Sequence, residues 1–157
     1  MYKATREFIK ARQPHAKYTV QLINGVRRIG GGVEGKCFDN SQKQVDHDKG
    51  ISIVSGWVVN KYDSCANLTA IIQHWWNADK DGFFDTSNVA DHYEYVIDMD
   101  LAQYVSENND SLASRVAYSL KLVNGSFSLI DIVDDNITDI PAQDLRTSIL
   151  FKHKGLR

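Results

Sequence analysis

Cysteine and proline are scarce in this chain of 157 residues, which contains two of each. Two cysteines cannot form the disulfide scaffold that holds many small secreted domains together. Two prolines exclude a proline-rich linker or recognition tract. No apolar run approaches the roughly 20 residues that a membrane-spanning helix needs. The sequence therefore predicts neither a disulfide-stabilised domain nor a membrane protein.

An excess of one charge is also absent, because 18 basic residues face 20 acidic ones and the formal net charge is -2. Basic residues interleaved with aromatic ones are absent too, so no nucleic-acid partner is predicted. The segment Met1 to Lys10 lacks the apolar stretch of a secretory signal. We therefore expect a cytoplasmic protein whose two thiols, Cys37 and Cys65, stay reduced.

The first half of the chain predicts two helices and several strands within one domain, residues 1–157. Helices are expected over Thr5–Gln13 and Phe38–Lys49, the second ending at Gly50. The nearly continuous apolar run Ile51–Val59 predicts a strand that is buried on both faces. Gly56 inside that run indicates that another part of the chain packs against its backbone. Further strands are expected at Tyr18–Ile23, at Leu68–Trp76, from Phe83 onward and at Tyr93–Ile97.

The second half predicts a hairpin, because Val116–Val123 alternates in polarity and Asn124-Gly125 favours a tight turn into Phe127–Val133. A helix from Leu112 to that glycine is the alternative. Short helices are expected at Leu101–Val105 and Pro141–Lys152. Helices and strands in this order make the predicted fold class α+β.

Three residues stand in an order that suits nucleophilic catalysis: Cys37, His74 and Asp85. Cys37 follows a glycine-rich loop and stands at the expected start of a helix. Free N–H groups and the partial positive charge of a helix N-terminus favour a thiolate and can hold an oxyanion. An imidazole would take the thiol proton, and a carboxylate would orient the imidazole.

The spacing of His74 and Asp85 decides whether they can meet. They lie on strands joined by the turn signal Asp79-Lys80-Asp81-Gly82. A loop with an even number of residues places both side chains on one face of the sheet. With a turn at Asp79-Lys80, His74 and Asp85 are directly opposite each other, and with a turn at Lys80-Asp81 they are diagonal neighbours. Cross-strand neighbours lie roughly 5 to 8 Å apart, close enough for long polar groups to bond. An odd loop without a bulge would separate them.

The residues around these three positions resemble the transglutaminase-like branch of the papain-like cysteine proteins. The likeness rests on Cys37 at a helix start, followed by Val54-Ser55-Gly56-Trp57-Val58-Val59, Gln73-His74-Trp75-Trp76 and Gly82-Phe83-Phe84-Asp85-Thr86, and it covers about a third of the chain. The chain departs from the family pattern at Trp75, where alanine is usual. Small bacterial and phage-encoded proteins show a similar order.

The resemblance implies a papain-like/transglutaminase-like core, an antiparallel sheet packed against a helix that starts at the cysteine. It also implies a Cys37-His74-Asp85 triad that forms a thioester, in an amide hydrolase or acyltransferase acting on a protein or peptide-like amide. Trp57, Trp75 and Trp76 are expected to line the substrate cleft. The alternative is a non-catalytic protein on the same fold, encoded by a phage or a bacterium, that binds a partner protein, in the host cytoplasm if phage-encoded.

No cofactor and no metal are predicted. The loop residues Asn77, Asp79, Asp81, Gly82 and Asp85 match five positions of a calcium-binding EF-hand loop, but Asn88 stands at the twelfth position in place of glutamate. Cys37, His47, Cys65 and His74 lack the closely spaced ligand pairs of a structural zinc site. An acidic turn and free thiols are the simpler interpretation.

Overall fold

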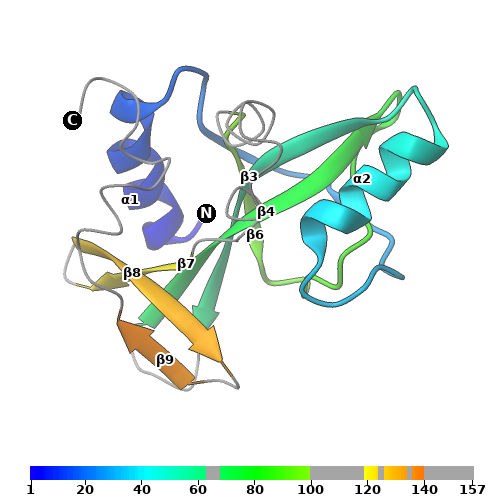
Figure 1. The fold of residues 1–157 in the computed structure, drawn as a ribbon. Coiled ribbons are helices and arrows are strands. Elements are labelled where there is room, and N and C mark those ends of the chain that lie inside the picture. Colours follow the sequence, from blue (N-terminus) through cyan, green and yellow to red (C-terminus); the bar gives the residue numbers. More distant parts are fainter. Residues whose placement is uncertain (63–67, 100–118, 124–125, 134–135, 140–157) are drawn as a thin grey trace.

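The computed structural model describes residues 1–62, 68–99, 119–123, 126–133 and 136–139 (Figure 1). Its helices are α1 (Lys3–Arg12) and α2 (Cys37–His47), and a 3-10 turn, η1 (Gln13–His15), follows α1. Its strands are β1 (Gln21–Ile23), β2 (Arg27–Arg28), β3 (Ser52–Tyr62), β4 (Leu68–Asp79), β5 (Gly82–Asp85), β6 (Glu94–Ile97), β7 (Ser119–Val123), β8 (Ser126–Val133) and β9 (Asn136–Asp139). The predicted α+β class is confirmed.

All nine strands belong to one mixed sheet in which β3 and β4 are the longest and form the centre. The order is β1-β6-β3-β4-β7-β8-β9, and each of these neighbours is antiparallel. The short β5 pairs with β4 and also with β2, which runs parallel to it. β7 pairs with positions 69–72 of β4 and β5 with positions 77–79. Among the described strands, positions 73–76 therefore pair only with β3.

α2 packs against β4 and β3, and α1 packs against β6. The Phe38 ring of α2 meets Trp75 edge-on, with centroids 5.6 Å apart, and the Phe8 ring of α1 meets Trp57 at 5.2 Å. Trp57 pairs with Gln73, two residues before Trp75, so the two tryptophans share a face. The helices therefore cover a single layer of aromatic side chains.

The opposite face carries a second apolar cluster, built from Val54, Val58, Trp76 and Tyr95. Residues of β3 are thus buried on both sides, as the continuous apolar run predicts. β6 can approach β3 closely because position 56 of β3 is glycine. A Cβ at this position would lie 2.0 Å from the carbonyl oxygen of Val96 in β6. The predicted close approach to the Gly56 backbone is confirmed.

The predicted elements in the described residues are largely present. The hairpin is confirmed, because Val123 pairs with Ser126. α2 ends earlier than expected, at His47, where Asp48 is the C-cap and its carboxylate accepts from the Gly50 N–H. The helices expected at Leu101–Val105 and Pro141–Lys152 lie outside the described residues. Within the described part, neither helix has the length and apolarity needed to cross a bilayer.

Candidate active site

The β4–β5 hairpin brings His74 and Asp85 together. Asp79 pairs with Gly82, so the turn is the two-residue Lys80-Asp81 and the loop is even. His74 and Asp85 then lie on one face in the diagonal relation, one of the two arrangements that the sequence left open. His74 Nε2 and Asp85 Oδ2 are 2.7 Å apart. Because an ionised carboxylate only accepts, Nε2 carries the proton of this bond.

Asp85 is 1% exposed and every one of its bonds favours the charged form. Its Oδ1 accepts the Ser87 N–H at 2.8 Å, and its Oδ2 accepts the Tyr95 hydroxyl at 2.6 Å besides His74. Burial alone would raise the pKa of the Asp85 carboxyl. The bond and charge of His74, with the Tyr95 and Ser87 bonds, outweigh burial and lower this pKa below its usual value.

His74 is 5% exposed and lies between two aromatic rings on the second face of the sheet. Its ring is nearly parallel to that of Trp76 and edge-on to that of Tyr95, with both centroids 6.0 Å away. Burial would lower the pKa of His74. Hydrogen bonds to Asp85 and to the Cys37 side chain, with the charges of both, overcome burial and raise this pKa to about 9.

Cys37 is the first residue of α2, and its partly buried side chain is within hydrogen-bonding reach of His74. Asp85 occupies Nε2, so Nδ1 is the ring nitrogen left for the thiol. The preceding loop turns through Gly35, whose φ of +70° suits glycine. Lys36 is the N-cap and offers no side-chain cap bond to the first N–H groups of the helix.

The position of α2 on the sheet is fixed by bonds that sit next to Cys37. Asn77 of β4 donates from Nδ2 to the Ser41 carbonyl at 3.0 Å and to the Ser52 carbonyl at 3.2 Å. The Ser41 hydroxyl in turn donates to the Cys37 carbonyl at 2.9 Å. The structure thus brings Cys37, His74 and Asp85 into one site, from three different elements.

The three tryptophans are placed differently from the cleft lining that the sequence predicts. Trp57, Trp75 and Trp76 are all 0% exposed. Trp75 is on the face opposite His74, because adjacent strand residues alternate, and Trp76 lies beneath the imidazole. These side chains support the site from within the core and present no surface to a substrate in this structure.

Tyr95 and Arg28 belong to the site and were not found by sequence reasoning. Tyr95 is 2% exposed, and the Arg28 guanidinium lies over its ring, 5.4 Å from the centroid. Burial, with the charge and bond of Asp85, raises the pKa of Tyr95 far above its usual value, against the effect of Arg28. The hydroxyl therefore keeps its proton and serves as a donor. Only the pairing of β6 with β3 places Tyr95 here, and no motif marks it.

The acidic turn has structural partners of its own. Arg27 donates to Asp79 Oδ1 at 2.7 Å, and the same oxygen accepts the Asp81 N–H at 2.8 Å. In the described residues no three His, Cys, Asp or Glu side chains gather as a metal site would require. Cys65 lies outside those residues.

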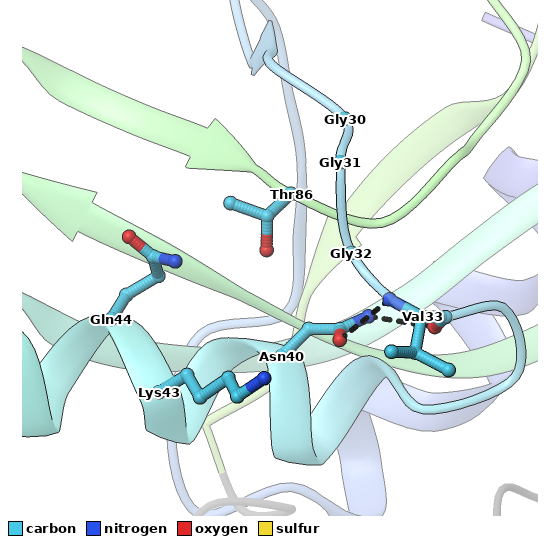
Figure 2. A pocket seen from close by; sticks show the side chains of 8 residues that line it. All are labelled: Gly30, Gly31, Gly32, Val33, Asn40, Lys43, Gln44 and Thr86. Atoms are coloured by element: carbon cyan, nitrogen blue, oxygen red, sulfur yellow. Dashed lines mark hydrogen bonds between the residues drawn. The ribbon is translucent and has the colours of Figure 1, made fainter.

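A glycine loop runs between Thr86, which follows β5, and Asn40 of α2 (Figure 2). The N–H groups of Ile29 and Gly30 both donate to the Asp85 carbonyl, and that of Gly32 donates to the Thr86 carbonyl. Asn40 of α2 holds the other side of the loop through two bonds to the Val33 backbone. The loop therefore joins the cysteine helix to the strand that carries Asp85.

Comparison with known proteins gives no relative from which a role can be inferred: no family model matches the chain, and no curated protein or solved structure matches it.

Proposed function

We propose that this chain is a cysteine-dependent amide hydrolase or acyltransferase built on a papain-like/transglutaminase-like core. The observation that carries the proposal is the continuous linkage from Asp85 to His74 to Cys37, at the start of a helix packed on the sheet. A structural histidine needs one satisfied partner. Here the imidazole bonds to a buried carboxylate and has a thiol within reach, which is the arrangement that nucleophilic catalysis requires.

In the proposed mechanism, His74 holds the proton taken from Cys37, and the sulfur attacks the carbonyl carbon of an amide. The C–S bond forms as the carbonyl π electrons move to oxygen. The N–H of Cys37, in the first turn of α2, donates to that oxyanion. When the C–N bond breaks, the leaving amine takes the proton from His74 and a thioester remains.

The second half of the reaction restores the enzyme. Neutral His74 accepts a proton from water, in hydrolysis, or from an amine, in acyl transfer, and the incoming atom displaces the sulfur. Asp85 acts throughout on His74, because its buried charge orients the ring and stabilises the imidazolium. The substrate class that suits this chemistry is a protein or peptide-like amide.

A second candidate function is binding of a partner protein without chemistry. The observation that favours it is the low exposure of the site: His74 is 5% exposed and the three tryptophans are fully buried. Under this alternative the linked residues stabilise the fold, and Cys37 is an ordinary thiol.

Alkylation of Cys37 with iodoacetamide as a function of pH separates the two candidates. We expect the wild-type thiol to react quickly at pH 6, with the rate at that pH falling by about tenfold or more in His74→Ala, because general-base partners typically contribute at least this much. The Cys37→Ala variant gives the background from Cys65. His47→Ala is the matched control, since His47 is exposed at the other end of the same helix.

Slow labelling at pH 6 that His74→Ala leaves unchanged would overturn the enzyme proposal and favour partner binding. Fast, His74-dependent labelling would support it. A screen of amide substrates would then use Cys37→Ala as the inactive comparison.

A further inference from the structure

A cavity of about 150 Å³ lies between the glycine loop and α2 (Figure 2). Its walls are the loop Gly30–Val33, the helix residues Asn40, Lys43 and Gln44, and Thr86. Asn40 follows Cys37 by one helical turn, and Thr86 follows Asp85 directly. Two walls of the cavity therefore come from the same chain segments that supply the proposed nucleophile and the carboxylate.

The walls of this cavity are held in place before any ligand arrives. A Cβ on Gly32 would lie 2.6 Å from Asn40 Nδ2 and 2.7 Å from the Thr86 carbonyl oxygen, so only glycine fits between helix and strand. Asn40, 4% exposed, also donates to the Ser87 hydroxyl at 3.3 Å. A fixed wall lowers the entropy lost on binding.

The charges around the cavity favour an anion. Among the described residues, Lys43 is the only charged one that lines the cavity, and its ammonium group makes no ion pair with any of them. The Gly31 N–H also has no acceptor in the described part of the chain. The backbone donors of this loop that are bonded include those of the residues on either side, Gly30 and Gly32. Gln44 and Thr86 add side-chain donors to the same wall. A small cavity that carries a cation and several N–H or O–H donors, with no acidic side chain among the described residues that line it, suits a carboxylate.

We propose that this cavity is a subsite for a carboxylate on the amide substrate, with Lys43 as its cationic anchor. The inference rests on the proposed function, because it assigns the cavity to the substrate of Cys37. The carboxylate has two sources in a peptide, an acidic side chain or the terminal carboxylate. The probes below separate them.

Three affinity labels of nearly equal size test the subsite through Cys37, whose sulfur displaces chloride from each. They are the chloroacetyl derivatives of glutamate α-amide, with a side-chain carboxylate, of glutamine, with a terminal carboxylate, and of glutamine α-amide, with neither. We expect one of the two acidic labels to half-saturate at a concentration roughly threefold to tenfold below that of the neutral label. Lys43→Met removes this preference. Lys10→Met, which deletes an exposed lysine of α1, preserves it.

The outcomes separate the subsite from the chemistry. The subsite proposal is overturned if all three labels half-saturate at the same concentration, or if the preference for an acidic label survives Lys43→Met. In either case, a His74-dependent reaction of the neutral label still supports the enzyme proposal. If His74→Ala leaves all labelling unchanged, the proposed function fails.

Binding is then measured without chemistry, in Cys37→Ala. The probes are acetyl-glutamate α-amide, acetyl-glutamine and acetyl-glutamine α-amide, followed by NMR through the amide signals of Gly30–Gly32. Saturable shifts with an acidic probe, lost in Lys43→Met, support the cavity as a carboxylate site. Shifts that are absent, or equal for the neutral probe, overturn it.

Discussion

The Tyr95 hydroxyl and the His74 imidazole donate to the same atom, Asp85 Oδ2, at 2.6 Å and 2.7 Å. Tyr95 comes from β6 and His74 from β4, with β3 between these strands. The carboxylate is thus held from both sides, and its second oxygen is fixed by the Ser87 N–H. Asp85 has no freedom to rotate away from the imidazole, so Tyr95 positions His74 through Asp85.

Removal of this hydroxyl, in Tyr95→Phe, should cost about 1.5–3 kcal/mol in the free energy of unfolding at pH 7, the usual value for a hydrogen bond to a charged group. The cost depends on pH, because the folded-state pKa of Asp85 is lowered and Tyr95 is one of the causes. The charged Asp85 carboxylate therefore stabilises the fold at pH values above its unfolded-state pKa, near 3.8. This contribution to the free energy of unfolding is lost as the pH falls through the folded-state pKa.

Urea unfolding of wild type and Tyr95→Phe from pH 7 down to pH 3 measures this dependence. We expect the gap between the two curves to narrow in the acid range. Tyr2→Phe is the matched control, because the Tyr2 hydroxyl donates to a carbonyl, that of His92, and not to a carboxylate. A gap for Tyr95→Phe that stays constant with pH would contradict the assigned role.

The raised pKa of His74 predicts a loss of stability in alkaline solution. The ring binds its proton more tightly when folded, with a pKa of about 9 against 6.5 for the free side chain. The protonated ring therefore stabilises the fold fully below pH 6.5, and this contribution is lost as pH rises through about 9. The slope is at most about 1.4 kcal/mol per pH unit, the value for one proton.

The measurement is the free energy of unfolding of wild type minus that of His74→Gln at several pH values between 6 and 10. We expect this difference to fall with pH across the interval. His47→Gln, at an exposed position of α2, is the matched control. A flat or rising curve for His74→Gln would mean that the imidazole does not hold its proton in the folded state.

The backbone of the site was accessible from the sequence because its signals are local. The apolar run of β3, the turn signal at Asp79-Lys80-Asp81-Gly82 and the glycine before α2 each act within a few residues. An even turn was enough to place His74 and Asp85 on one face, since side chains alternate along a strand. The glycine at position 56 similarly indicated a close contact before its partner, Val96, was known.

The missed features depend on contacts between distant segments. Arg27-Arg28 carries no strand signal, and becomes β2 only because β5 offers it a parallel edge. Tyr95 reaches Asp85 because β6 pairs with β3, which no local pattern specifies. The tryptophans next to His74 were identified as cleft residues from their neighbourhood in sequence. Their burial follows from the two helices and the second apolar cluster that cover them.

A buried ion pair beneath α1 gives the final prediction. Arg12 Nε donates to Asp98 Oδ2 at 2.8 Å, and Trp57 Nε1 donates to the same oxygen at 3.0 Å. Both charged side chains are 1% exposed. Asp98→Asn keeps the shape and removes the charge that compensates Arg12, so we expect a loss of about 3 kcal/mol or more in the free energy of unfolding.

The control is Asp79→Asn, which removes the carboxylate that Arg27 contacts at the same kind of distance, 2.7 Å, but at the surface, where the Arg27 side chain is 43% exposed. Water screens this pair, so little change is expected. Chemical denaturation of the two variants beside wild type makes the comparison. Equal effects would mean that the Arg12–Asp98 pair is solvated, and that α1 is not anchored to the sheet through this buried charge.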